Sequence, residues 1–166
     1  MAVLYFAYGS NMHPGRLRTR LGSAFAVDTA RLIDYRLVFH KRGADGSGKG
    51  DIVPAVGEEV WGVLYRLHPR DAKLLDQIEG RGYTRYSLAV ENSTADRQVE
   101  AFAYRAQATA IAPGLQPFSW YLDFLREGAR HHGLPRHYAA ALGEIPVISD
   151  PDPVRHRRAR LLLESA

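Results

Sequence analysis

A short polar segment follows the first apolar stretch of the chain. Residues 8–12 read Tyr-Gly-Ser-Asn-Met and come directly after the apolar residues 3–7. A strand that ends in Gly, Ser and Asn leaves several backbone N–H groups outside the sheet, and in a turn these groups can together bind a carboxylate or an oxyanion. An ordinary strand-to-helix turn, with Gly9 giving backbone freedom and Asn11 capping the next turn, explains the same residues. The segment alone leaves both interpretations open.

A second candidate is Glu79, which precedes Gly80 at the end of a predicted amphipathic helix. At a helix C-terminus the macrodipole disfavours the charged form of a carboxyl group, and partial burial acts in the same direction. A carboxyl group in such a place is suited to act as a general base near neutral pH. The alternative is a solvated surface glutamate, which costs the helix about a few tenths of a kcal/mol.

Three tyrosines form a third group of candidates. Tyr83 and Tyr86 follow the predicted base closely, and Tyr138 lies further along the chain. Their phenol groups could orient a substrate by hydrogen bonding. Because tyrosine is equally suited to a half-buried strand face, we expect at least one of the three to belong to the core.

Three other patterns lack the spacing that their chemistry requires. Residues 45–50 superficially resemble a phosphate loop, but Lys49 is followed by Gly50 instead of Ser or Thr. His131 and His132 are adjacent and would point apart on a helix, so they form no HExxH-like zinc face. Ser10 lacks the GxSxG elbow of a serine hydrolase.

Composition places the chain among ordinary globular domains. It has 166 residues, of which 46% are hydrophobic and 24% are charged, and it has no cysteine. The absence of cysteine excludes disulfides, thiolate metal sites and a cysteine nucleophile, and it permits a reducing compartment. No apolar run approaches the ~20 residues that cross a bilayer, and the first residues lack the pattern of a signal peptide. We therefore predict a soluble, cytoplasmic, single-domain protein.

The net charge of +4 comes from one end of the chain. Four arginines, at positions 155, 157, 158 and 160, account for the whole excess. The remaining sequence is neutral and predicts no basic face for nucleic acid. A basic tail can bind anionic partners, but a solvated helix end is the more ordinary interpretation, and we favour it.

Hydrophobic patterns indicate strands first and helices later. Strands are predicted over residues 3–8, 24–40 (one or two), 59–67, 86–91 and 98–105. Helices are predicted over residues 13–21, 69–80, 117–131, 135–142 and 153–164, the last of them docking through Leu161, Leu162 and Leu163. Residues 43–50 contain four glycines and are predicted to be a mobile loop, and their glycine content suggests the hypothesis that they close over the substrate as a lid. This order is typical of an α+β protein, and a small barrel or strongly curved sheet would avoid exposed edges.

Four ordered segments together resemble the gamma-glutamylcyclotransferase family, the AIG2-like group. The matching segments are residues 8–12 (the YGSN[LM] signature), 59–65 (its VWG strand), 75–80 with Tyr86 (LDxxEG…Y) and 128–138 (G…GLPxxY). The resemblance spans residues 5–138. The YGSN form argues against the glutathione-specific branch, which has YGSL.

This resemblance implies a small mixed β-barrel with flanking helices over residues 1–150. Residues 151–166 are predicted separately, as a basic helical tail. The implied enzyme has no cofactor and no metal, and it cyclises a γ-glutamyl amide to 5-oxoproline with release of an amine or amino acid. Glu79 falls on the position of the family's catalytic acid and base. The positions implied to bind substrate are Tyr8, Gly9, Ser10, Asn11, Met12, Tyr86 and Tyr138.

The chemistry of that reaction requires only groups that Glu79 and the polar segment over residues 8–12 can supply. The substrate carries its own nucleophile, an α-amine, so one base and one group of amide donors suffice. The implied partner is a small γ-glutamyl substrate, without nucleic acid or membrane, and the leaving group and oligomeric state stay open. One alternative is a non-catalytic binding or regulatory domain, which a glutamate pointing into solvent would favour. Another is a biosynthetic tailoring enzyme that removes a γ-glutamyl protecting group.

Overall fold

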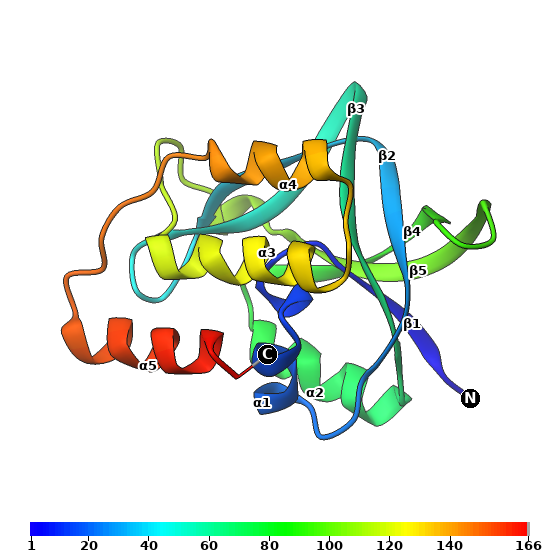
Figure 1. Ribbon diagram of the computed structural model, residues 1–166, viewed down its shortest axis with the longest axis horizontal. Coiled ribbons are helices and arrows are strands. Elements are labelled where there is room, and N and C mark those ends of the chain that lie inside the picture. Colours follow the sequence, from blue (N-terminus) through cyan, green and yellow to red (C-terminus); the bar gives the residue numbers. More distant parts are fainter. Residues whose placement is uncertain (166) are drawn as a thin grey trace.

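The core of the protein is a closed five-stranded barrel (Figure 1). The computed structural model describes residues 1–165. The strands are β1 (Val3–Ala7), β2 (Phe25–Arg42), β3 (Gly48–Leu67), β4 (Tyr83–Asn92) and β5 (Arg97–Ala106). They follow the order β1-β3-β2-β4-β5, and all neighbours pair antiparallel except β1 and β5, which pair in parallel. The predicted α+β class with a small mixed barrel and flanking helices is therefore confirmed.

Five α-helices and two short 3₁₀ turns surround the barrel. They are η1 (Ser10–Met12), α1 (Pro14–Arg20), α2 (Pro69–Glu79), η2 (Ala108–Ala110), α3 (Ser119–His131), α4 (Arg136–Gly143) and α5 (Pro153–Leu163). Helices α1, α2 and α5 each begin with a proline at the first helical position, where the missing N–H is not needed. Figure 1 shows α3, α4 and α5 gathered on one side of the molecule, opposite the β4–β5 turn.

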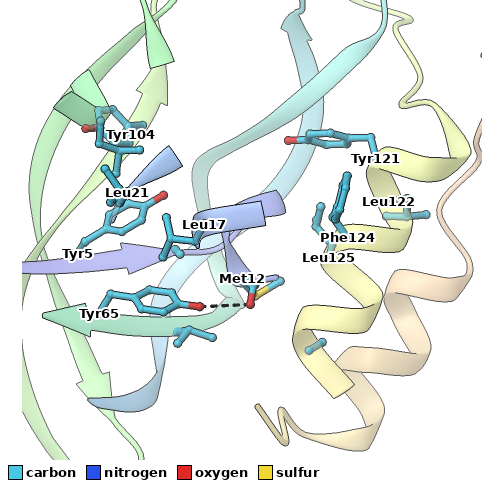
Figure 2. Packing of buried hydrophobic residues seen from close by; sticks show 14 of the residues in the cluster. Tyr5, Met12, Leu17, Leu21, Tyr65, Tyr104, Tyr121, Leu122, Phe124 and Leu125 are labelled. Carbon is cyan, nitrogen blue, oxygen red and sulfur yellow. Dashed lines mark hydrogen bonds between the residues drawn. The ribbon is translucent and has the colours of Figure 1, made fainter. Parts of the chain in front are cut away.

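Two hydrophobic clusters hold these layers together. Because side chains alternate along a strand, β1 directs Phe6 into the barrel and its neighbour Tyr5 outward to the helices. The outer cluster joins the barrel to α1 and α3 through Leu17, Phe124 and Leu125, as Figure 2 shows. Burial of each such side chain contributes roughly 1.5–3 kcal/mol. The helices are thereby fixed against the end of β1, where the polar segment begins.

The loop predicted over residues 43–50 is shorter in the structure, where residues 43–47 connect β2 and β3 and residues 48–50 belong to β3. Strand β3 begins at Gly48, and Ser47, Gly48 and Gly50 are all buried. The backbone N–H of Gly48 donates to the carbonyl of Gln116 at 2.9 Å, and a side chain at position 48 would overlap the carbonyl oxygen of Phe39. Glycine here permits a close approach of backbone segments. These contacts tie the start of β3 into the barrel wall, so the predicted lid is limited to the connection over residues 43–47.

The basic segment at the end of the chain forms α5, which packs on α1 and α3. Ala159 and Leu163 are buried, one helical turn apart, whereas Leu161 is 63% exposed on the other face. The predicted docking edge is thus correct for Leu163 and for Leu162, which is half-buried against the same cluster, and wrong for Leu161. Among residues 1–165, no helix is long and apolar enough to span a membrane.

Candidate active site

A pocket opens where β1 ends, and it joins parts of the chain that are far apart in sequence. Its walls come from β1 and the following turn, from the start of β3, from the end of α2, from β4 and β5, and from α3. The lining residues are Tyr5, Tyr8, Gly9, Ser10, Asn11, Gly50, Glu79, Tyr83, Tyr104 and Tyr121. Five of the eight predicted site residues are in this set. One carboxyl group and several phenols therefore face a common space.

Glu79 is the last residue of α2, and its side chain turns toward the polar turn after β1. Its Oε1 accepts a hydrogen bond from Asn11 Nδ2 at 3.1 Å and another from Arg20 Nη1 at 3.1 Å. The side chain is 15% exposed. Within the described part of the chain, its Oε2 accepts no hydrogen bond. One oxygen is thus held in place while the other is available to a ligand.

Arg20 ends α1 and provides the counterion of this carboxylate. Its Nη1 donates both to Glu79 Oε1 and to Asn11 Oδ1, each at 3.1 Å. The ion pair places a positive charge directly against Oε1 of Glu79 and ties the end of α1 to the end of α2. Nothing in the local sequence singles out Arg20, because the pairing joins two helices 59 residues apart.

Asn11 connects three groups of the site. It is 3% exposed, and its Nδ2 donates to Tyr5 Oη at 3.0 Å as well as to Glu79. Its Oδ1 accepts from Arg20, so both ends of the amide are used. This buried amide fixes the carboxylate relative to β1 and α1. Asn11 does not cap the next helix. The side chain that caps the start of α1 is that of His13.

The turn η1 has two backbone donors without an acceptor at the wall of the pocket. The N–H groups of Ser10 and Asn11 open this 3₁₀ turn, where no preceding residue of the turn can accept from them. Among residues 1–165 neither N–H has a hydrogen-bond acceptor. Both residues are buried at the pocket wall. The geometry is suited to stabilising negative charge on an oxygen atom of a ligand.

The phenols of the pocket are neutral at physiological pH. Burial raises the pKa of Tyr5, Tyr83 and Tyr121 above the ordinary value of 10, and the charge of Glu79 acts in the same direction. Tyr83 Oη donates to the carbonyl of Gly50 at 2.6 Å, and Tyr121 Oη accepts from the N–H of Gly50 at 3.0 Å. Figure 2 shows Tyr5 and Tyr121 extending their hydroxyl ends toward the space between β1 and α3. These rings form rigid walls with polar ends.

Three of the predicted binding residues do not line the pocket. Met12 is fully buried in the outer cluster, where its carbonyl accepts from Tyr65 Oη at 3.3 Å (Figure 2). Tyr86 is 43% exposed, because it lies three positions after Tyr83 and this odd spacing places it on the other face of β4. Tyr138 lies on α4 outside the pocket, with its buried hydroxyl unpartnered among the described residues.

The site also contains residues that the sequence did not point out. Tyr5, Tyr104 and Tyr121 come from β1, β5 and α3, and only the closed barrel and the packing of α3 bring them to Glu79. Tyr5 alone had a local signal, because it precedes the polar segment in the same strand. Among residues 1–165 no group of three or more His, Asp or Glu side chains is arranged to hold a metal ion.

The chain is similar to known proteins over most of its length. A family model described as the AIG2-like family matches residues 59–142. A gamma-glutamylcyclotransferase from Bos taurus is 30% identical over 149 residues, which cover 87% of this chain and 79% of the relative. A gamma-glutamylcyclotransferase from Homo sapiens is 31% identical with the same coverage.

Solved structures share the fold. A structure described as a gamma-glutamyl cyclotransferase superposes with a TM-score of 0.89 over 100% of both chains, at 24% identity. An uncharacterized protein from Homo sapiens gives a TM-score of 0.85 at 26% identity, over 96% of this chain and 98% of the other. The family model, the two relatives and the shared architecture lead to one conclusion: the chain belongs to the AIG2-like, gamma-glutamylcyclotransferase family of enzymes.

Proposed function

We propose that this enzyme cyclises a γ-glutamyl amide to 5-oxoproline and releases the amine or amino acid that was bound to the γ-carbonyl. The observation that carries the proposal is the placement of Glu79 in the pocket wall, with one carboxyl oxygen held by Asn11 and Arg20 and the other without a hydrogen bond from the described residues. A glutamate pointing into solvent would instead have favoured a binding domain. Relatives named gamma-glutamylcyclotransferase support the same reaction class.

The reaction balances without water or any external reactant. The α-amine of the substrate attacks its own γ-carbonyl carbon, a new C–N bond closes the five-membered ring, and the original amide C–N bond breaks. One proton leaves the attacking nitrogen and one proton is added to the leaving nitrogen. Folding the substrate so that amine and carbonyl meet is a proximity effect of the pocket walls.

Glu79 transfers both of these protons in our proposal. In its charged form, Oε2 accepts a proton from the attacking α-amine, and the resulting carboxylic acid donates it to the leaving nitrogen. The hydrogen bonds from Asn11 and Arg20 to Oε1 hold the carboxyl group in one orientation during both steps. A single carboxyl group can serve as base and then acid because the two nitrogens share the same carbon.

The backbone donors of Ser10 and Asn11 have the complementary role. Negative charge develops on the γ-carbonyl oxygen when the amine adds, and two fixed N–H groups stabilise that charge without reorganising. The neutral phenols of Tyr5, Tyr83 and Tyr121 limit the space around the forming ring. Their hydrogen bonds to Asn11 and to Gly50 keep the rings in position.

The proposal is tested with a panel of substrates and a product assay. The purified protein is incubated with γ-glutamyl amino acids, γ-glutamyl amines and glutathione, and 5-oxoproline is measured by mass spectrometry. We expect 5-oxoproline from at least one class and no free glutamate. Free glutamate carrying ¹⁸O from labelled water would indicate hydrolysis and refute cyclisation, and a folded protein that forms neither product would refute the assigned reaction.

A further inference from the structure

A second hollow adjoins the pocket at Glu79. It shares Ser10, Glu79, Tyr83 and Tyr121 with the first pocket. We call it the basic annex, because its charged lining residues are the cations Arg16, Arg20, Lys41 and Lys49 and the carboxylates Asp45 and Glu79. Four positive charges face two negative charges, although the sequence outside the C-terminal arginines is neutral overall.

Three of the four cations are engaged by other groups of the protein. Arg20 pairs with Glu79 at 3.1 Å, and Lys49 pairs with Asp45 at 2.8 Å. Arg16 Nε donates to Ser10 Oγ at 2.9 Å, and its guanidinium lies over the ring of Phe124, 4.8 Å from the centroid. These contacts fix the walls of the annex, and the charges of Arg20 and Lys49 are each paired with a carboxylate of the protein.

Lys41 is the exception. Within the described residues, no carboxylate oxygen lies within 4.0 Å of its Nζ, which lies over the ring of Tyr83 at 4.7 Å from the centroid. The ammonium is seated against Gly82, where a Cβ atom would lie 2.6 Å from Lys41 Cε and 3.0 Å from Nζ. Burial lowers the pKa of Lys41, and the charges of Glu79 and Asp45 oppose that effect. A partly desolvated cation with unused donors is a strong site for an anion.

The position of Glu79 determines which part of a substrate enters the annex. Because its carboxyl group exchanges protons with both nitrogens, both lie at the wall that the two hollows share. Asn11, whose backbone N–H binds the γ-carbonyl oxygen in the proposed function, lines only the tyrosine-lined pocket, so the ring-forming half of the substrate occupies that pocket. Whatever is attached to the leaving nitrogen extends toward Lys41. An amino acid on that nitrogen carries a carboxylate one carbon away, whereas a simple amine carries none.

We propose that Lys41 binds the carboxylate of the leaving group and so makes the enzyme select γ-glutamyl amino acids over γ-glutamyl amines. This inference rests on the proposed function and assigns the residue that sets its leaving-group specificity. The carboxylate is remote from the bonds that change, so its contact with Lys41 is equally strong in the substrate and in the transition state. Such uniform binding lowers KM and leaves kcat largely unaffected.

Two substrates that differ only in this carboxylate test the inference. γ-Glutamyl-L-alanine and γ-glutamyl-ethylamine share every other group, so the ratio of their kcat/KM values isolates it. We expect Lys41→Met to lower the ratio of alanine to ethylamine substrate about tenfold, through a higher KM for the alanine substrate, and Lys41→Glu to lower it further. Lys73→Met is the matched control, because Lys73 is exposed on α2, away from both hollows.

The outcomes separate this inference from the proposed reaction. If Lys41→Met leaves the ratio of the two kcat/KM values unchanged, which includes an equal loss for both substrates, then Lys41 does not bind the leaving-group carboxylate and the inference is wrong. Titration calorimetry of both compounds with the Glu79→Gln variant, with and without Lys41→Met, gives the same ratio without turnover. An absence of 5-oxoproline with both substrates would therefore refute the proposed reaction, and the calorimetric ratio would still show whether Lys41 binds the carboxylate.

Discussion

The ion pair between Arg20 and Glu79 allows a quantitative prediction. Replacing Arg20 with Met keeps an apolar stem but removes one of the two donors to Glu79 Oε1 and the donor to Asn11 Oδ1. Because Arg20 acts through Glu79, it is a positioning residue. Its loss is expected to lower kcat with little change in KM.

The magnitude follows from the geometry and the exposure. A hydrogen bond to a charged group is worth about 1.5–3 kcal/mol when it is shielded from water. The side chains of Arg20 and Glu79 are 22% and 15% exposed, so water partly replaces the lost donor, and we take about 1.5–2.5 kcal/mol. At 1.36 kcal/mol per factor of ten, kcat is expected to fall about 10- to 70-fold.

Steady-state release of 5-oxoproline measures this effect, with the Tm of each variant as a check on folding. Arg20→Lys is expected to recover part of kcat. An ammonium restores the positive charge but not the planar guanidinium geometry that donates to both Glu79 and Asn11. Arg18→Met is the matched control, since Arg18 is exposed on the same helix. A wild-type kcat for Arg20→Met, or an equal loss in the Arg18 control, would refute the positioning role.

Two further predictions concern stability. Gly62→Ala places a Cβ 2.5 Å from the carbonyl oxygen of Ala7, and we expect it to lower the free energy of unfolding by about 1–3 kcal/mol. Gly143→Ala is the control, because open space surrounds that position and we expect no such loss of stability. Equal Tm values for the two variants would contradict this prediction. Hydrogen bonds from Arg155 hold the pKa of Asp150 below its ordinary value of 3.8. The stability that this pair contributes is therefore present above pH 4 and is lost progressively as the pH falls below 4. We expect the difference in Tm between the wild type and Asp150→Asn to shrink between pH 5 and pH 2. A difference in Tm that stays constant over this range would contradict the prediction.

Elements with a local signal were predictable from the sequence. Helix α2 begins at a proline and ends at a glycine, so its length and the position of Glu79 at its C-terminus follow from the residues themselves. The polar turn after β1 was equally visible, because an apolar strand stops at Gly9. These two local features meet in space and supply the core of the site.

Features that depend on long-range packing were not predictable. The partner of Glu79 on α1 depends on how two helices cross, and no spacing in the sequence encodes that contact. Tyr83 and Tyr86 show the limit within one strand: both are tyrosines near the base, but only the observed register of β4 decides which one faces the pocket. The glycines of residues 43–50 suggested one mobile loop, but they have different local reasons: Gly48 lies in close contact with Phe39 and Gln116, whereas Gly46 has a positive φ of 83° in the connection before β3.

The most direct test of the account is the turnover of the Glu79→Gln variant. Glutamine keeps the size of the side chain and can still be held by Asn11, but it cannot accept and return a proton. With the substrate identified by the panel, we predict that 5-oxoproline formation falls by about 10²–10⁴-fold, while calorimetry shows substrate binding within a few-fold of wild type. A variant that binds the substrate and still forms 5-oxoproline at a rate within tenfold of wild type would contradict the assignment of Glu79.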